Sequence, residues 1–408
     1  MVKALGKTKF EPLMHISKRS DIEKWKSWLI RIGAGVLGLF VCAIVSAIFT
    51  KSFGGFFSSL FVGVFGSERR IWKLIKDIAI LLCLALAVTP AFKMKFWNIG
   101  AEGQTIIGCL MSVICVHYLG SSLPNAALLV IMFLAAVAGG ALWAVIPALF
   151  KAKWNTNETL FTLMMNYVGM QLVSFAINSW DTTGHAMYGS LTTGLFPSVG
   201  GNQYVINIII AVVMTIAVFI YLRFSKHGYE LTVVGESVNT AKYIGINVKK
   251  VIIRTMLVSG ALCGIVGLMI VSGDAKTITP SVVSGRGFTA ILVSWLAHFS
   301  PIGMVLTSFI VVFITQGAGQ VSTDFDLGSA AFADMIAGVF LFFIIACEFF
   351  INYKVKFNMS HGFFKPLKKA QERRAAKKAA KEIVVDTVGD AQTADVEEDI
   401  ISTEEERD

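Results

Sequence analysis

Charged residues are scarce in this chain. Asp, Glu, Lys and Arg make up 15% of its 408 residues, whereas 55% are hydrophobic. A soluble domain of this length needs more charge to cover its surface, so the composition excludes an ordinary soluble protein. The apolar residues also occur in long runs, which favours helices that cross a membrane.

A spanning helix needs roughly 20 apolar residues to cross about 30 Å of hydrocarbon. The sequence predicts ten such segments, at 28–50, 71–92, 98–119, 123–149, 159–180, 204–224, 251–272, 287–299, 301–320 and 331–351. The segment 287–299 is short enough to be re-entrant or broken, so eight to ten spans are expected. No Ala-x-Ala cleavage site follows the first segment, which is interpreted as a retained span. The predicted fold class is an all-α polytopic membrane protein.

Lys and Arg are missing from the long loop 181–203, although the net charge of the chain is +9. With ten spans, the basic clusters fall on the opposite side of the membrane from this loop. Because cytoplasmic loops carry the basic excess, both termini are predicted to be cytoplasmic, and nucleic acid is not expected as a partner. The exceptions are Lys51, Arg69, Arg70, Lys276 and Arg286.

Composition divides the chain into three parts. Residues 1–27 form a basic cytoplasmic segment, 28–351 the transmembrane domain and 352–408 a charged cytoplasmic tail that is expected to be partly disordered. The tail is basic over 365–381 and acidic from 382 onward, so its basic stretch is suited to anionic membrane lipid. The alternative is a solvated tail without a specific role.

Catalytic and metal-binding patterns are also missing. The six cysteines all lie inside apolar segments without metal-ligand spacing, so they are interpreted as packing residues. The chain has no complete P-loop, no H-E-x-x-H and no G-x-S-x-G. We therefore expect no enzyme activity and no cofactor in this chain, and ATP-driven transport would need another subunit to bind ATP and Mg²⁺.

Two polar, glycine-containing interruptions lie inside the membrane domain, at 98–104 and 284–288. Irregular backbone at membrane depth is tolerated where protein or a water-filled cavity satisfies it. The interruptions occupy corresponding places if spans two to five are repeated, in inverted orientation, by spans seven to ten. Inverted repeats with paired broken helices are typical of transporters and predict a pathway between the halves.

Six polar or aromatic residues are predicted to border this pathway. They are Asn98, Glu102, Gln104, Asn166, Phe288 and Gln316. A charge such as Glu102 is costly in hydrocarbon, so it must face protein, water or the interface. Its alternative role is an anion at a helix N-terminus, and for Asn166 and Gln316 the alternative is ordinary hydrogen bonding between helices.

Glycines in the second half of the chain are placed to permit helix packing and to end a short helix. Gly260, Gly264 and Gly267 are spaced for close approach of another helix. In the cytoplasmic loop that precedes them, 239–244 is predicted to form a short helix ended by Gly245. Such a helix is suited to docking a cytoplasmic partner, and the alternative is a plain connector.

Several of these motifs resemble one family of membrane proteins. The stretch 98–104 (NIGAEGQ) resembles the hallmark of permease subunits in ABC importers of nucleosides and simple sugars, which are related to branched-chain amino-acid permeases. The stretches 157–167, 228–246, 259–267 and 285–296 resemble further blocks of that family. The resemblance covers roughly residues 80–320 in the family's order. The glutamate form of the hallmark is more typical of the nucleoside branch.

The resemblance implies a multi-pass subunit of an ATP-driven importer in the bacterial plasma membrane. Two permease chains, identical or related, would form the pore, and an extracytoplasmic binding protein or lipoprotein would deliver the solute. Cytoplasmic ATPases would dock on a segment that contains Glu236, Asn239, Lys242, Tyr243 and Gly245. Nucleosides are the expected cargo, and the alternatives are a ribose-like sugar, a branched-chain amino acid or, outside the family, an ion-coupled secondary transporter or a membrane-embedded enzyme.

Overall fold

The computed structural model describes residues 14–19, 23–180, 187–327 and 330–357. Every predicted span lies at least partly within these ranges. The predicted basic and acidic stretches of the tail, at 365–381 and beyond, lie outside the described residues.

Each of the ten predicted spans coincides with a helix. These helices are α1 (Lys24–Thr50), α3 (Glu68–Lys93), α4 (Ala101–Leu119), α5 (Asn125–Trp154), α6 (Glu158–Trp180), α7 (Val205–Phe224), α10 (Val248–Ile270), α11 (Arg286–Leu296), α12 (Pro301–Asp324) and α13 (Ala330–Asn352). Among the described residues, eight helices are long and apolar enough to cross a membrane. The all-α polytopic fold is therefore confirmed, within the expected range of eight to ten spans.

The two predicted spans outside those eight are α3 and α11. Helix α3 has 26 residues, and its first third is charged while the remainder is almost wholly buried. Helix α11 has only 11 residues, in agreement with a broken eighth span. The buried part of α3 is covered by other helices, so it does not need the uniform apolar surface of a helix exposed to lipid. Helix α11 is only partly covered, with Phe288 and Trp295 exposed.

Four further helical elements lie outside the ten helices that match predicted spans. Helix α2 (Phe53–Phe65) follows α1, and α8 (Lys226–Glu236) and α9 (Val238–Tyr243) lie between α7 and α10. A π-helical turn, η1 (Val271–Ala275), ends α10. The side chain of Ser52 accepts a hydrogen bond from the Gly55 N–H and so begins α2 with an N-cap.

The chain divides into two compact units. The terminal unit comprises 1–36 and 343–408, and the central unit comprises 37–342. In the terminal unit, strand β1 (Met14–Lys18) pairs antiparallel with β2 (Tyr353–Phe357), and Arg31 forms an ion pair with Glu348 at 2.9 Å. Strands that precede α1 and follow α13 can pair only on one side of a membrane. The chain therefore crosses an even number of times, as expected for two cytoplasmic termini.

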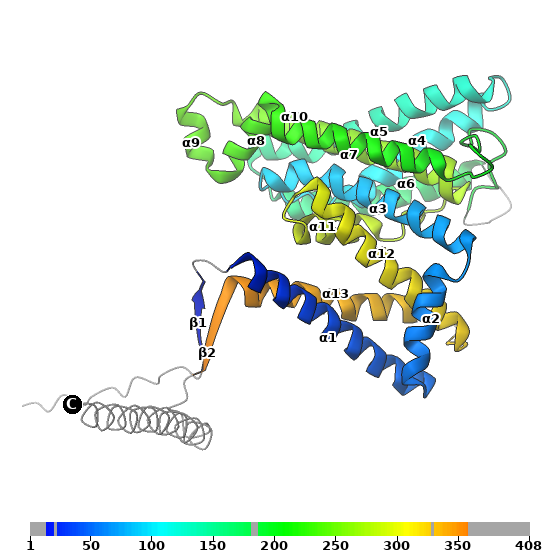
Figure 1. The fold of residues 1–408 in the computed structure, drawn as a ribbon. Coiled ribbons are helices and arrows are strands. Elements are labelled where there is room, and N and C mark those ends of the chain that lie inside the picture. The colour runs from blue at the N-terminus through cyan, green and yellow to red at the C-terminus, as the bar shows by residue number, and fades with distance from the viewer. Residues whose placement is uncertain (1–13, 20–22, 181–186, 328–329, 358–408) are drawn as a thin grey trace, which may run out of the picture. The chain divides into compact units, whose positions relative to one another are not determined.

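Helix α10 lies at the centre of the central unit and packs against α3, α4 and α5 (Figure 1). Its three glycines make the predicted close approaches. A Cβ added to Gly264 would lie 2.1 Å from the Ala136 carbonyl oxygen, and one added to Gly260 would lie 2.3 Å from that of Gly140. All six cysteines are buried and unpaired, which agrees with a packing role.

The helix contacts partly match an inverted repeat. Helix α10 packs against α3, α4 and α5, and α3 packs against α10, α11 and α12. Exchanging α3, α4 and α5 with α10, α11 and α12 therefore reproduces the same set of contacts. The pairs α4–α5 and α11–α12 also correspond.

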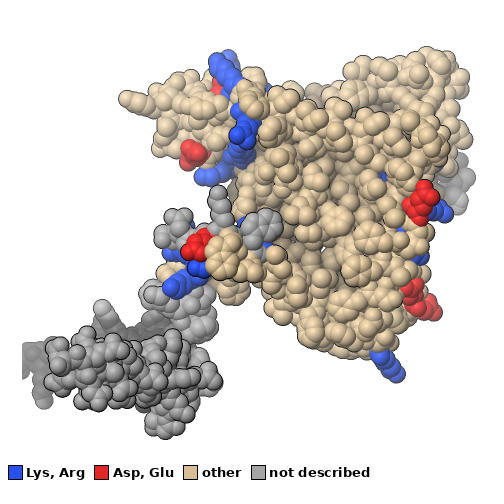
Figure 2. Space-filling view, viewed as in Figure 1, with Lys and Arg blue, Asp and Glu red and all other residues tan. Residues whose placement is uncertain are grey.

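The surface of the central unit has the character expected of a bundle in lipid. Figure 2 shows a broad face almost without charged side chains, with Lys and Arg gathered near α8 and α9. Large apolar side chains on α5 and α7 are exposed, including Leu134, Leu142, Val213 and Ile216. Exposed apolar surface of this extent indicates contact with lipid chains.

Candidate functional site: a polar core beside a membrane cavity

The two interruptions predicted from the sequence meet in space. Glu102, in the first turn of α4, accepts hydrogen bonds from the backbone N–H groups of Gly285 and Gly287, each at 2.8 Å. These N–H groups lie at the N-terminus of α11, where the first N–H groups lack partners within the helix. The carboxylate, only 1% exposed, thus supplies both acceptors and a favourable charge for the helix dipole.

Glycine is required where α11 meets α4. A Cβ added to Gly287 would lie 2.6 Å from the Glu102 backbone nitrogen and 2.7 Å from its Oε2. Gly285 has a φ of +73°, in the left-handed region that other residues adopt only with strain. The glycines of 284–288 therefore permit both the turn and the close contact of the two helix starts.

A second buried network fixes the residues before α4. Asn98 and Gln104 exchange side-chain hydrogen bonds at 3.1 and 3.3 Å. The Asn98 amide also donates to the Ser259 hydroxyl at 3.4 Å, and Ser259 donates to the Ala87 carbonyl at 2.8 Å. The network joins the 98–104 segment to α10 and α3.

Asn166 connects the same segment to α6. Its Oδ1 accepts from the Gly103 N–H at 2.8 Å, and its Nδ2 donates to the Ile99 carbonyl at 2.9 Å. Asn98, Glu102, Gln104 and Asn166 are therefore all buried in contacts between elements. These contacts match the alternatives given for Glu102, an anion at a helix N-terminus, and for Asn166, hydrogen bonding between helices. A role in the pathway stays a prediction for all four residues.

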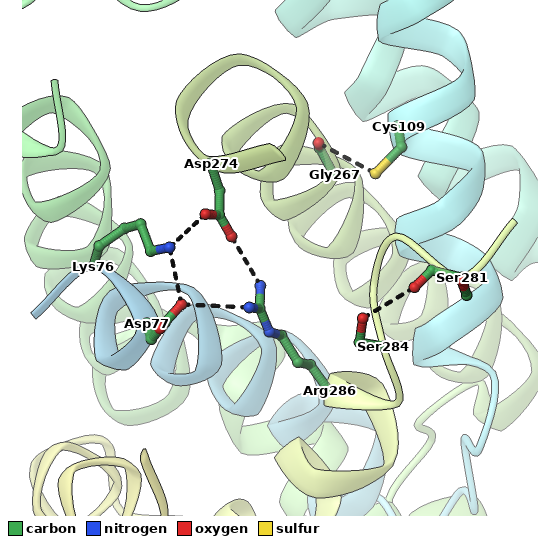
Figure 3. A network of polar contacts seen from close by, with 8 residues as sticks. All are labelled: Lys76, Asp77, Cys109, Gly267, Asp274, Ser281, Ser284 and Arg286. Carbon is green, nitrogen blue, oxygen red and sulfur yellow. Dashed lines mark hydrogen bonds and ion pairs between the residues drawn. The ribbon is translucent and has the colours of Figure 1, made fainter. Parts of the chain in front are cut away.

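Four charged side chains form a compact cluster nearby (Figure 3), which we call the charged quartet: Lys76, Asp77, Asp274 and Arg286. Lys76, only 4% exposed, contacts Asp77 at 3.1 Å and also binds Asp274. Arg286 contacts Asp77 at 3.3 Å and Asp274 at 3.2 Å. The quartet has no net charge and joins α3, the π-turn η1 and α11, so each buried charge is paired.

A cavity of about 740 Å³ opens beside the quartet. Its wall is formed by α2, α3, the start of α11, α12 and α13. Its polar and charged lining residues are Arg70, Lys73, Asp77, Ser284, Arg286, Thr289, Thr315, Gln316, Gln320, Thr323 and Asp334. A volume of this size, with mixed polar and apolar walls, is typical of small-molecule sites.

Gln316 is the one predicted pathway residue in this wall. Its Nε2 donates to the carbonyls of Gly63 and Arg70, at 3.3 and 3.1 Å. Phe288, which is 39% exposed, is not among the residues that line the cavity. Its predicted role in the pathway stays a prediction.

The sequence did not identify the quartet as a site. Asp77 lies inside the predicted span 71–92, and Arg286 is one of the exceptions to the predicted charge distribution. Asp274 was placed outside the predicted segment 251–272, whereas the π-turn extends the helix to Ala275. Isolated charges at the ends of apolar segments were the available signal, because such charges need partners.

The segment between α7 and α10 exposes the residues that are predicted to dock the ATPases, and their docking role stays a prediction. Glu236, Asn239, Lys242 and Tyr243 are all exposed, Tyr243 to 93%. Helix α9 ends in a Schellman motif, because the Gly245 N–H bonds to the Lys242 carbonyl and the next N–H to that of Ala241. Gly245 has a φ of +82°, as expected for the residue that follows a helix.

Broken helices, a partly buried charged quartet and a polar cavity within an apolar bundle define a membrane transport protein. The family model for the permease component of the branched-chain amino acid transport system matches residues 70–345. The chain belongs to this permease family, as the motif resemblance indicated, and is a multi-pass protein of the plasma membrane.

Named relatives span most of the chain. It is 29% identical to the glucose ABC transporter permease protein TsgB13 of Haloferax volcanii, over 72% of this chain and 81% of that one. It is 26% identical to the guanosine ABC transporter permease protein NupP of Bacillus subtilis, over 83% and 97%. It is also 26% identical to the nucleoside ABC transporter permease protein NupB of Lactococcus lactis subsp. cremoris, over 81% and 93%.

Proposed function

We propose that this chain is the pore-forming permease of an ABC importer for nucleosides. The observation that carries the proposal is the polar cavity beside the charged quartet, in a chain that aligns with nearly the full length of a guanosine permease and a nucleoside permease. A nucleoside offers hydroxyl, amine and carbonyl groups, which the charged, amide and hydroxyl side chains of the wall can bind.

Transport is driven by ATP hydrolysis in a separate ATPase subunit, which binds the ATP and Mg²⁺, and this chain performs no catalysis. The ATPase docks on the exposed segment that includes Glu236, Asn239, Lys242 and Tyr243, with Gly245 setting the direction in which the chain leaves α9. A cysteine introduced at Lys242 should crosslink to the ATPase in membranes. A cysteine at exposed Lys51, which is predicted to lie on the outer side, is the control and should not. Failure of every crosslink from position 242 would exclude this docking site.

The remaining partners follow from the family. A second permease chain, identical or related, completes the pore, and an extracytoplasmic binding protein or lipoprotein delivers the solute. ATP-driven closure of the ATPases moves the α3–α6 and α10–α13 sets against each other and so alternates access to the cavity.

The decisive experiment is uptake of a labelled purine nucleoside by cells with and without the gene. Each culture is challenged with an excess of unlabelled ribose, glucose, leucine or a second nucleoside. We expect ATP-dependent uptake that is lost on deletion and blocked by nucleosides alone. Unchanged nucleoside uptake with lost sugar or amino-acid uptake would refute the cargo and leave the permease assignment intact.

Sugar import is the second candidate. It is favoured by the similarity to the glucose permease TsgB13. Selective block of uptake by glucose or ribose in the same experiment would establish it.

A further inference from the structure

The two carboxylate oxygens of Asp77 have different surroundings. Oδ1 takes both ion pairs of this residue, with Lys76 and with Arg286, as Figure 3 shows. Within the described part of the chain, no hydrogen bond or ion pair to Oδ2 is found. Asp77 lines the cavity, and its side chain keeps 15% exposure. One oxygen is therefore held in place while the other is left to a ligand in the cavity.

The other carboxylates nearby are less suited to a ligand. Asp274 uses both oxygens within the quartet, with Lys76 on Oδ1 and Arg286 on Oδ2, and it is not among the cavity residues. Asp334 lines the cavity from α13, but no described contact fixes its side chain. Asp77 is thus the carboxylate that is both exposed to the cavity and held in one orientation, which lowers the entropic cost of binding.

The charge of the wall indicates the kind of donor that Asp77 receives. Arg70, Lys73 and Arg286 line the cavity against the carboxylates of Asp77 and Asp334, so the wall is positive by one charge. A positive wall disfavours an ammonium group, such as that of an amino acid. A neutral O–H donor has no such penalty.

An ionised carboxylate oxygen accepts through two lone pairs and can receive two adjacent hydroxyls. Acidic side chains bind ribose hydroxyls in this way in dinucleotide sites. We propose that Asp77 Oδ2 accepts hydrogen bonds from the vicinal diol of the transported solute and is the residue by which the cavity selects diols. The proposal rests on the proposed function and specifies the part of the solute that is recognised.

The test compares uptake of adenosine with uptake of 2′-deoxyadenosine by cells that express the complete transporter. In the wild type, the deoxy compound should have the higher KM. Asp77→Asn should raise the KM for adenosine about tenfold, the loss expected for one hydrogen bond to a charged group, with little change for 2′-deoxyadenosine. Asp77→Glu, which keeps a carboxylate, should restore part of the discrimination.

Asp274→Asn is the matched control, because it also removes one carboxylate of the quartet but no oxygen left to a ligand. It should affect the two nucleosides by the same factor. If Asp77→Asn also affects both equally, or affects neither, the proposal is overturned and Asp77 only stabilises the quartet.

A second measurement needs no variant. Labelled adenosine bound to the purified wild-type transporter, without binding protein, is displaced with adenosine, 2′-deoxyadenosine, ribose or glucose. Displacement by 2′-deoxyadenosine should be about tenfold weaker than by adenosine. Equal displacement would overturn the role of the diol while leaving nucleoside import standing. Should the transporter bind no adenosine but bind ribose or glucose, nucleoside import fails, and Asp77→Asn is then tested with a sugar and its deoxy analogue.

Discussion

Glu102 and Gly287 join the starts of two broken helices, because the Gly287 N–H donates to Glu102 Oε2 at 2.8 Å. The same carboxylate holds the Gly285 N–H through its other oxygen. The N-terminus of α11 thus finds its acceptors on α4 rather than in its own sequence. The contact couples the two halves of the membrane domain at the points where each helix is interrupted.

Replacing Glu102 with alanine should destabilise the protein and reduce uptake. Each buried N–H that loses its acceptor costs about 1–3 kcal/mol. Glu102→Gln retains one acceptor oxygen and should lie between alanine and the wild type. The melting temperature of the detergent-purified protein and uptake in cells provide the two readouts. Glu68→Ala is the control, because Glu68 lies in the first turn of α3 but accepts only an exposed hydrogen bond, from Trp72 at 3.3 Å, and its loss should cost less than about 1 kcal/mol.

The helices that match the ten predicted spans were predictable from the sequence, because each of them contains its own run of apolar residues. The short length of α11, the close approach at Gly264 and the end of α9 at Gly245 were predictable for the same reason, since the responsible residues are local. The contact of Glu102 with α11 was not predictable. Glu102 is separated in sequence from Gly285 by 183 positions and from Gly287 by 185, and only the packing of the helices brings them together.

The strand pair β1–β2 was not predicted, although the sequence of β2 has the alternating pattern of a strand. The segment Tyr353–Phe357 (YKVKF) alternates apolar and basic residues, the period of a strand. Its partner strand lies at the opposite end of the chain, and local pattern does not identify such a partner. The quartet was missed for the same reason, because its residues come from α3, η1 and α11, which only the packed fold brings together.

Three of the five basic residues that departed from the predicted charge asymmetry have partners in the structure. Arg286 belongs to the quartet, Arg70 donates to the Val62 carbonyl at 2.7 Å, and Lys276 donates to Gln203 at 2.8 Å. Their charges are used within the fold. The asymmetry of the remaining loops therefore stays a valid guide to orientation.

The quartet should behave as a unit when its charges are removed. Lys76→Met leaves two carboxylates against one guanidinium, and we expect a loss of about 2–4 kcal/mol, less than for a fully buried pair because the Arg286 side chain is 30% exposed. The double variant Lys76→Met with Asp274→Leu restores neutrality. It should be more stable than Lys76→Met alone, as measured by melting temperature. Additive losses in the double variant would contradict coupling within the quartet.

Gly264→Ala should be strongly destabilising. The new methyl group would lie 2.1 Å from the Ala136 carbonyl oxygen, and backbone of α5 must move to admit it. The expected loss is about 3 kcal/mol or a failure to accumulate in membranes. Gly35→Ala in α1, where no atom lies within 4 Å of the added Cβ, is the control and should be neutral or slightly stabilising. Equal tolerance of both substitutions would show that α10 and α5 do not pack as closely as described.

The ion pair between Glu230 in α8 and Arg254 near the start of α10 should make stability depend on pH. Their side chains meet at 2.6 Å, and the hydrogen bond from Arg254 lowers the pKa of Glu230 below its ordinary value. A carboxyl group whose pKa is lowered in the folded state stabilises the protein at pH values above its unfolded pKa, about 4.3. That contribution is lost as the pH falls through the lower, folded pKa.

We therefore expect Glu230→Gln to lower stability by about 1 kcal/mol at pH 7. The difference from the wild type should shrink as the pH falls below about 4. Melting temperatures of both proteins in detergent, measured from pH 7 downward, test this. Glu236→Gln, at an exposed position of the same helix, is the matched control and should show no such convergence, because no ion pair of Glu236 is found among the described residues. A constant difference between Glu230→Gln and wild type at all pH values would mean that packing of this side chain, and not its charge, stabilises the α8–α10 contact.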